Sequence, residues 1–206
     1  DVVSVVDFPV PYRLQLLHLS DGEAGLLASQ TAPYLAALVD AFDNTYANTL
    51  ILAGGDNFIP SPFLNGGTDL SVRDELNAVT GSTISLSAST NHPIAAVDIA
   101  IHNLLGVEAS TIGNHEFDLG SRVFRDSFMP GSVSGWVGAQ FPYLSANLDF
   151  SADVDLNPRF TNTTATPGLE EASAQKGKIV PSAVVTKNGE KIGLVGATTQ
   201  VLEQIS

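Results

Sequence analysis

Short apolar runs alternate with amphipathic stretches along the first half of the chain. The runs at 13–20, 49–53 and 109–112 have the length and composition of buried strands. Between them, 31–46 and 93–105 place apolar residues three and four positions apart, which predicts two helices. The alternation of strands with helices predicts a fold of the α/β class.

Each predicted helix has an apolar face and a proline near its start. In the helix at 31–46, we expect Pro33 in the first turn, because proline lacks a backbone N–H. In the helix at 93–105, Pro93 is expected at the first position, and Gly106 is expected to end the helix. The expected apolar faces consist of Leu35, Leu38, Val39 and Phe42 in the first helix and of Ile94, Val97, Ile101 and Leu104 in the second.

The remaining segments are predicted to be two long loops and a hairpin. Residues 57–92 are rich in Ser, Thr, Asn, Gly and Pro, so we expect a long excursion with a short helix at 72–79. Residues 151–177 are predicted to form a second surface loop. Strands at 180–186 and 191–197 flank an Asn-Gly pair, which is typical of a two-residue hairpin turn.

Composition excludes several classes of function. The formal charge of −13, with nine Lys plus Arg, argues against a nucleic-acid-binding surface and against binding to an anionic membrane. The chain has no cysteine, which excludes disulfides, thiolate zinc sites and cysteine nucleophiles. It has no apolar run of about 18 residues, so we predict no membrane span. With 206 residues and 44% hydrophobic content, it can bury a sizeable core.

Polar groups follow three of the predicted strands. Asp21-Gly22-Glu23 follows the first strand, Gly54-Gly55-Asp56 follows the second, and the sequence GNHEFD at 113–118 follows the third. In α/β proteins, binding and catalytic residues are commonly located in the loops that follow the strands. If the three ends converge on one edge, they form an oxygen-rich pocket suited to metal ions.

These blocks, in this order, resemble the calcineurin-like metallophosphoesterases, and most closely their 5′-nucleotidase and alkaline phosphatase branch. The resemblance continues through 103–109, 145–148 and 189–196. It implies a four-layer α/β/β/α sandwich, incomplete in this chain. It also implies that residues 1–206 are the N-terminal portion of a catalytic domain, with the remainder of the protein following Ser206.

The resemblance implies a site for two divalent metal ions, Ca, Mn, Zn or Mg. Asp21 would bind the first ion, Asp56 would bridge both, and Asn114 would bind the second through its amide oxygen. Where the family usually has Asp-x-His, this chain has Asp21-Gly22-Glu23. Glu23 is therefore either a carboxylate ligand in place of a histidine or a solvated loop charge, and as a ligand it would favour Ca²⁺, Mn²⁺ or Mg²⁺ over zinc.

The resemblance also implies a catalytic histidine. His115 would contact the phosphate and help to protonate the leaving oxygen, and Asp118 would hold the other ring nitrogen. Glu116 is expected to be structural. Among the other histidines, His18 is expected either to pack or to support a ligand of the site without binding an ion itself, while His102 lies four residues after Asp98, a spacing that suits an exposed pair.

The function implied is a metal-dependent phosphate monoester hydrolase acting on a nucleotide or another small phosphomonoester, in a secreted, periplasmic or cell-surface protein. Two alternatives stay open. The first is a non-catalytic metal-binding or ligand-binding surface module, because Glu23 stands where the family has histidine and the family's two downstream histidine loops do not occur after His115 here. Such loops after Ser206 would favour the enzyme, and their absence there would favour the module. A phosphodiesterase would use the same metal site. We expect the 206-residue segment to be inactive or nearly so when it is made alone.

Overall fold

The computed structural model describes residues 11–22, 28–85, 91–162 and 170–205. Its centre is a sheet of five parallel strands in the order β1-β2-β3-β4-β5, and a separate antiparallel pair, β6 and β7, follows along the chain. The strands are β1 (Gln15–Leu19), β2 (Thr49–Ala53), β3 (Ala109–Thr111), β4 (Tyr143–Leu144), β5 (Ile179–Val180), β6 (Ser182–Lys187) and β7 (Glu190–Val195).

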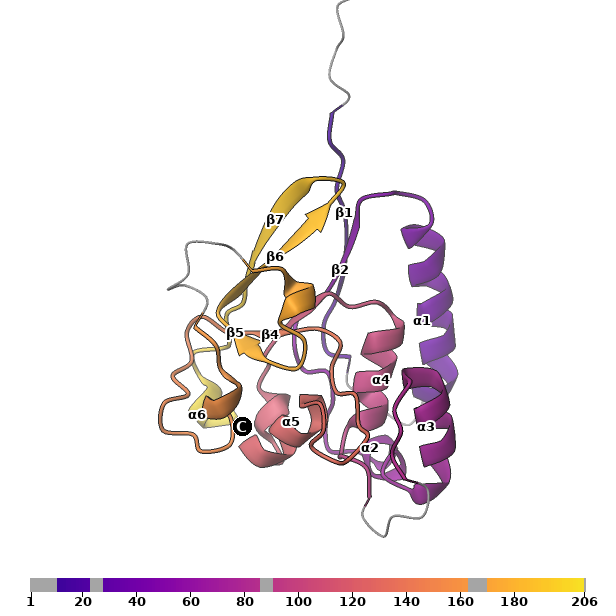
Figure 1. Ribbon diagram of the computed structural model, residues 1–206, viewed down its shortest axis with the longest axis vertical. Coiled ribbons are helices and arrows are strands. Elements are labelled where there is room, and N and C mark those ends of the chain that lie inside the picture. The colour runs from indigo at the N-terminus through magenta and orange to yellow at the C-terminus, as the bar shows by residue number, and fades with distance from the viewer. Residues whose placement is uncertain (1–10, 23–27, 86–90, 163–169, 206) are drawn as a thin grey trace, which may run out of the picture.

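Helices connect the parallel strands. A long helix follows β1, several short helices lie between β2 and β3, and a helix follows β3 (Figure 1). The α-helices are α1 (Ala28–Asp43), α2 (Pro62–Gly66), α3 (Arg73–Thr80), α4 (Ala96–Leu104), α5 (Ser121–Phe128) and α6 (Leu202–Ile205). The 3-10 turns are η1 (Leu70–Val72), η2 (His115–Phe117), η3 (Asn157–Arg159) and η5 (Ala172–Ala174).

The two faces of the parallel sheet carry different layers. Successive side chains of a strand point to opposite faces. In β2, Ile51 joins the apolar core shared with the helices, whereas Leu50 joins a second core shared with β6. Tyr143 and Leu144 divide in the same way in β4. Figure 1 shows the corresponding arrangement, with α1 and α4 on one side and the β6–β7 hairpin on the other. The predicted α/β class is confirmed.

The prediction that the first strand is buried is wrong. β1 pairs with β2 and lies at the end of the sheet order, and its burial alternates between partly buried and exposed residues. Leu16 is 53% exposed. Leu16 points to the face of the sheet that carries the second core. The buried residues of that core come from other strands and from η5, so they do not cover Leu16.

Both long helices differ from the prediction. In α1, Pro33 lies inside the helix rather than in its first turn, because the helix begins at Ala28. Leu35, Leu38 and Phe42 are exposed, and Val39 packs against the core. α4 begins at Ala96, after Ala95 in the left-handed conformation with φ 64°, so Pro93 precedes the helix.

The apolar face predicted for the second helix is only partly right. Leu104 is 62% exposed, and Ile99, which lies outside the predicted face, is fully buried, whereas Ile94 and Ile101 pack partly buried against the core. Apolar side chains surround most of this helix, so their spacing does not select one face. The predicted stop is confirmed: Gly106 has φ +76°, and its N–H donates to the carbonyl oxygen of Asn103 at 3.1 Å.

The excursion after β2 packs as part of the core. Leu64 of α2, Leu76 of α3 and Ile84 are buried in the cluster that also contains Ile99 of α4. The helix predicted at 72–79 is present as α3. In the predicted hairpin, Asn188 and Gly189 connect β6 to β7 with φ values of 49° and 87°, which matches the two positive φ angles of a type I′ turn.

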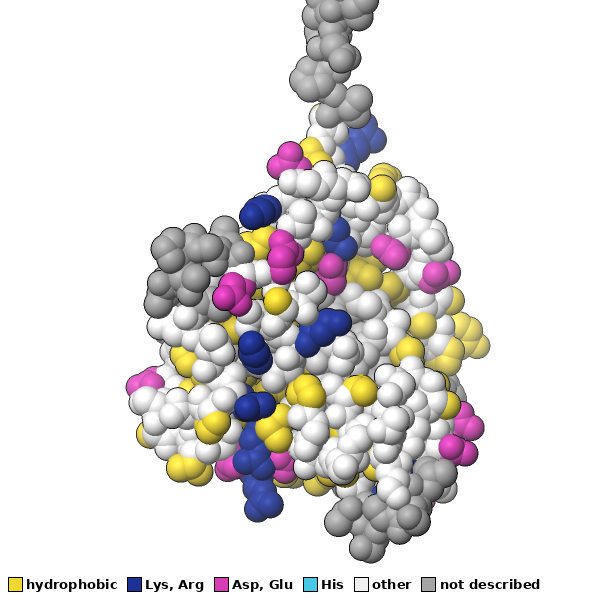
Figure 2. Space-filling view, viewed as in Figure 1, with side chains coloured by type: hydrophobic (Ala, Val, Ile, Leu, Met, Phe, Trp, Pro, Cys, Tyr) yellow, Lys and Arg dark blue, Asp and Glu magenta, His cyan; other side chains and the backbone are white. Residues whose placement is uncertain are grey.

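The surface is mixed in charge on the face that Figure 2 draws. Lysine and arginine side chains form a broken line there, interrupted by acidic, hydrophobic and neutral groups. Among the described helices, none combines the length and the apolar character needed to cross a bilayer.

Candidate functional site

The three strand ends that were predicted to carry the site lie next to one another at the carboxyl end of the sheet. β1, β2 and β3 run parallel, so their carboxyl ends face the same way. The Gly54 N–H donates to the Leu19 carbonyl at 2.7 Å, and the Asp21 N–H donates to the Gly55 carbonyl at 3.3 Å. The loops that carry Asp21 and Asp56 are therefore in direct contact.

The loops after β2 and β3 approach each other through two glycines. A Cβ atom added to Gly55 would lie 2.4 Å from the backbone nitrogen of Gly113, and Gly55 has φ +91°. A Cβ added to Gly113 would lie 2.2 Å from Asp56 Oδ1. Both positions need glycine, because any side chain would push the loops apart. The Asp56 carboxylate thus rests against the main chain that precedes Asn114.

Asp21 and Asp56 share an uncommon backbone conformation. Each has φ 53°, in the left-handed region that aspartate tolerates better than most residues. Sequence reasoning placed both residues at strand ends but contained no signal for this geometry.

His115 is tied to the neighbouring loop and to Asp118. Its backbone N–H donates to Asp56 Oδ1 at 2.8 Å, and its ring Nδ1 lies 2.7 Å from Asp118 Oδ2. The two side chains meet because η2 is a 3-10 turn, in which residues three apart lie on the same face. The predicted contact between Asp118 and the ring of His115 is present.

Glu116 lies beneath these loops and is fully buried. Its carboxylate accepts hydrogen bonds from the backbone N–H groups of Asp56 at 3.0 Å, Asn57 at 2.9 Å and Gly113 at 2.7 Å. Burial raises its pKa to about 7, and the three hydrogen bonds act in the opposite direction. The expected structural role is consistent with this position, but the sequence did not indicate which groups the side chain would hold.

Asn57 was not identified from the sequence. It is fully buried, and its Nδ2 donates to Ser110 Oγ at 2.9 Å and to the Tyr143 hydroxyl at 3.0 Å. Burial raises the pKa of Tyr143 well above its usual value, so this hydroxyl stays protonated. The network connects the residue after Asp56 to β3 and β4, and an Asn in a polar loop gives no sequence signal for such a role.

The exposed pair predicted for His102 and Asp98 is wrong, and His18 is not packed. His102 and Asp98 are buried rather than exposed, and His102 Nδ1 lies 2.8 Å from the Asp98 backbone oxygen. Burial raises the pKa of Asp98 to about 7 and lowers that of His102. His18 is exposed on the edge strand, where its ring borders Gly54.

Three of the four predicted metal ligands lie within the described residues. Among residues 11–22, 28–85, 91–162 and 170–205, no three His, Cys, Asp or Glu side chains are grouped so that they could hold an ion. Asn114 is not one of these residue types, and Glu23 lies outside the described residues. The proposed ligands that the structure brings to one edge are Asp21, Asp56 and Asn114.

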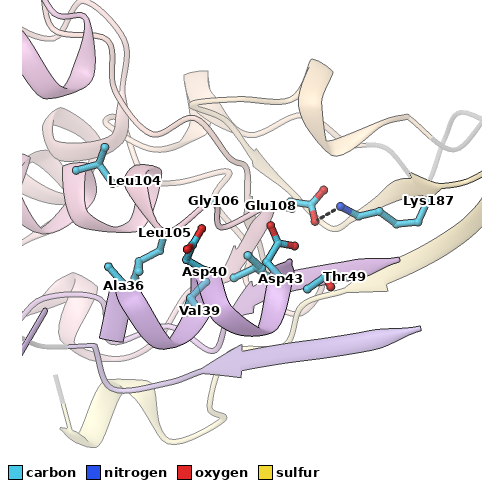
Figure 3. A pocket seen from close by; sticks show the side chains of 11 residues that line it. Ala36, Val39, Asp40, Asp43, Thr49, Leu104, Leu105, Gly106, Glu108 and Lys187 are labelled. Atoms are coloured by element: carbon cyan, nitrogen blue, oxygen red, sulfur yellow. Dashed lines mark ion pairs between the residues drawn. The ribbon is translucent and has the colours of Figure 1, made fainter. Parts of the chain in front are cut away.

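A separate hollow lies at the amino end of the sheet, near the starts of β2 and β3. It measures about 400 Å³ and is lined by the end of α1, the end of α4 and Glu108. Figure 3 shows Asp40 and Asp43 beside Glu108, whose carboxylate is paired with Lys187 at 2.8 Å. This hollow is distinct from the candidate site.

The chain is similar to known proteins over part of its length. No family model matches the chain. Over 112 residues, the chain is 31% identical to the trifunctional nucleotide phosphoesterase YfkN of Bacillus subtilis (strain 168). This match covers 50% of this chain and 7% of that protein. Over 102 residues, it is 32% identical to a 5′-nucleotidase of Diplobatis ommata. This second match covers 50% of this chain and 14% of that protein.

A solved structure is similar over most of the chain. A 5′-nucleotidase precursor from Thermus thermophilus matches with a TM-score of 0.55 and 26% identity, covering 94% of this chain and 30% of that one. The chain thus spans well under half of the length of each of these relatives. The predicted resemblance to 5′-nucleotidases is confirmed.

Proposed function

We propose that the chain is the N-terminal portion of the catalytic domain of a metal-dependent phosphate monoester hydrolase, of the alkaline phosphatase or 5′-nucleotidase type. One observation carries the proposal: the His115 N–H donates to Asp56 Oδ1, while the His115 ring contacts Asp118. A carboxylate suited to a metal and a histidine suited to proton transfer are thereby joined. The similarity to a nucleotidase and a nucleotide phosphoesterase over half of the chain supports the same class of reaction.

The proposed ligands of two divalent ions are Asp21, Glu23, Asp56 and Asn114. Their donors fit such ions, because carboxylate and amide oxygens suit Ca²⁺, Mn²⁺ and Mg²⁺, and carboxylates also bind zinc. The missing side chain at Gly113 lets the Asp56 carboxylate reach the loop of Asn114, as a shared ligand requires. When bound, such ions activate a water as nucleophile and neutralise the phosphoryl oxygens.

His115 is the proposed catalytic residue. Asp118 Oδ2 holds the ring through Nδ1 at 2.7 Å, which fixes the rotation of the imidazole. The Nε2 atom is then the one proposed to contact the leaving oxygen of the substrate and to give it a proton. Asp118 also stabilises the positively charged ring that donates this proton.

The proposed substrate is a nucleotide or another small phosphomonoester. The net charge of −13 would repel such an anion, so the proposed cations also serve to reverse the local field. The acidic composition supports a secreted, periplasmic or cell-surface location as part of this proposal.

The proposal is tested by phosphate release from p-nitrophenyl phosphate. We would compare the 206-residue chain with a longer protein that carries it at the N-terminal side, each loaded with Ca²⁺, Mn²⁺, Mg²⁺ or Zn²⁺. The longer protein should be active. The short chain should be inactive or nearly so, because four side chains leave two ions incompletely coordinated and the water poorly positioned.

Two results would contradict the proposal. Metal binding without hydrolysis in the longer protein would favour a non-catalytic binding module. Preference for bis-p-nitrophenyl phosphate over the monoester would favour a phosphodiesterase.

A further inference from the structure

The Glu116 side chain joins two loops that carry proposed metal ligands. Oε2 accepts from the backbone N–H of Asp56 at 3.0 Å and from that of Gly113 at 2.7 Å, while Oε1 accepts from Asn57 at 2.9 Å. Two of these donors lie in the loop after β2 and one lies in the loop after β3. A single carboxylate therefore spans the gap between the loops.

The groups that Glu116 holds are those that place the ligands. One donor is the amide of Asp56 itself, and another is the amide of Gly113, the residue before Asn114. A return bond runs from the His115 N–H to Asp56 Oδ1 at 2.8 Å. Together these bonds fix the main chain at Asp56 relative to the main chain on either side of Asn114.

Another side chain could not easily do the same. Buried backbone N–H groups need acceptors, and a buried carboxylate needs donors, so the arrangement satisfies both. A glutamine at 116 would offer one acceptor oxygen and one NH₂ donor. At least one of the three amides would then face another donor, and the loops would separate to reach water.

We infer that Glu116 is a positioning residue, which sets the spacing of Asp56 and Asn114 and thereby the affinity of the site for divalent cations. This inference rests on the proposed function. Groups that orient metal ligands without touching the ion typically change metal affinity by about 10- to 100-fold when they are replaced. A role in stability alone would lower the melting temperature and leave the affinity of the folded protein unchanged.

The test is Mn²⁺ binding to the longer protein that carries this chain at its N-terminal side, measured by calorimetry at a temperature where circular dichroism shows each variant to be folded. Glu116→Gln should weaken binding by about 10-fold or more. Glu108→Gln is the matched control: it also removes a glutamate charge beside β3, but at the opposite end of the strand, where Glu108 pairs with Lys187. This control should bind Mn²⁺ as the wild type does.

The outcomes separate the inference from the proposed function. If the wild type binds Mn²⁺ and folded Glu116→Gln binds it equally well, the inference is overturned and the proposed function stands. If the wild type binds no Mn²⁺, the proposed function fails, and the positioning role fails with it. Equal weakening in Glu108→Gln would show a general effect of charge and would also overturn the inference.

A second measurement covers the case in which Glu116→Gln does not fold. Amide hydrogen exchange in the wild-type chain, followed by NMR, should be slow at Asp56, Asn57 and Gly113, although all three lie outside helices and strands. Exchange at unprotected peptide rates at Asp56 and Gly113 would mean that Glu116 does not hold these amides. That result would overturn the inference without any variant.

Discussion

The backbone N–H of His115 donates to Asp56 Oδ1 at 2.8 Å, across 59 positions of sequence. This bond joins the loop after β2 to the loop after β3 at the carboxyl edge of the parallel sheet. It places a proposed shared metal ligand beside the proposed catalytic histidine.

Asp56→Asn should remove most bound metal while the fold is retained. Asparagine keeps an oxygen that can accept from the His115 N–H, but it lacks the negative charge that two ions would share. Metal content after dialysis and the circular dichroism spectrum provide the two readouts. Retention of stoichiometric metal by a folded variant would exclude Asp56 as a bridging ligand.

Gly113→Ala should destabilise the protein by about 1–3 kcal/mol, as overpacking of a tight site does. The added Cβ would lie 2.2 Å from Asp56 Oδ1, so the loop must shift. The matched control is Gly66→Ala in α2, where an added Cβ meets nothing within 4 Å. Urea unfolding measures both changes. A loss of stability as large in the control as in Gly113→Ala would refute the role of the close approach.

Asp98→Asn should make stability less dependent on pH. Burial raises the Asp98 pKa from 3.8 to about 7, so between these values the folded protein keeps a proton that the unfolded chain loses. The free energy of unfolding of the wild type should therefore fall as pH rises from about 4 to about 7, by at most about 1.4 kcal/mol per pH unit from this group. Above pH 7 the loss is complete.

Urea unfolding of Asp98→Asn and of the wild type at several pH values measures this difference. The free energy of unfolding of the variant should change less with pH than that of the wild type. Part of the pH dependence should remain, because the pKa of Glu116 is also raised to about 7. The variant should be the more stable protein above pH 7, and the difference should vanish near pH 3, where the wild-type acid is protonated in both states. Identical slopes would show that Asp98 does not titrate in this way.

Glu23→His should shift metal preference toward zinc if Glu23 is a ligand. Imidazole suits zinc better than a carboxylate does, and the change restores the Asp-x-His pattern. Competition between Mn²⁺ and Zn²⁺, with metal content measured by atomic emission, checks this prediction. An unchanged ratio of bound metals would mean that Glu23 is a solvated loop charge.

The order of strands and polar loops could be predicted from the sequence because these features are local. The β2 strand was predicted with its observed bounds, and the apolar runs before Asp56 and Asn114 indicated which strand ends carry the proposed ligands. The contact between His115 and Asp118 follows from a spacing of three residues. The turn at Asn188 and Gly189 follows from the backbone freedom of those residue types.

What only the tertiary structure decided depends on neighbours that are distant along the chain. α4 is apolar on most sides, and its packing in the folded chain buries Asp98 and His102 while leaving Leu104 exposed. Leu16 is exposed because β1 occupies an edge, which its own sequence does not specify. Glu116 binds amides from residues 56, 57 and 113, and a hydrogen bond between loops leaves no pattern in either segment, because its donors are backbone groups that every non-proline residue carries.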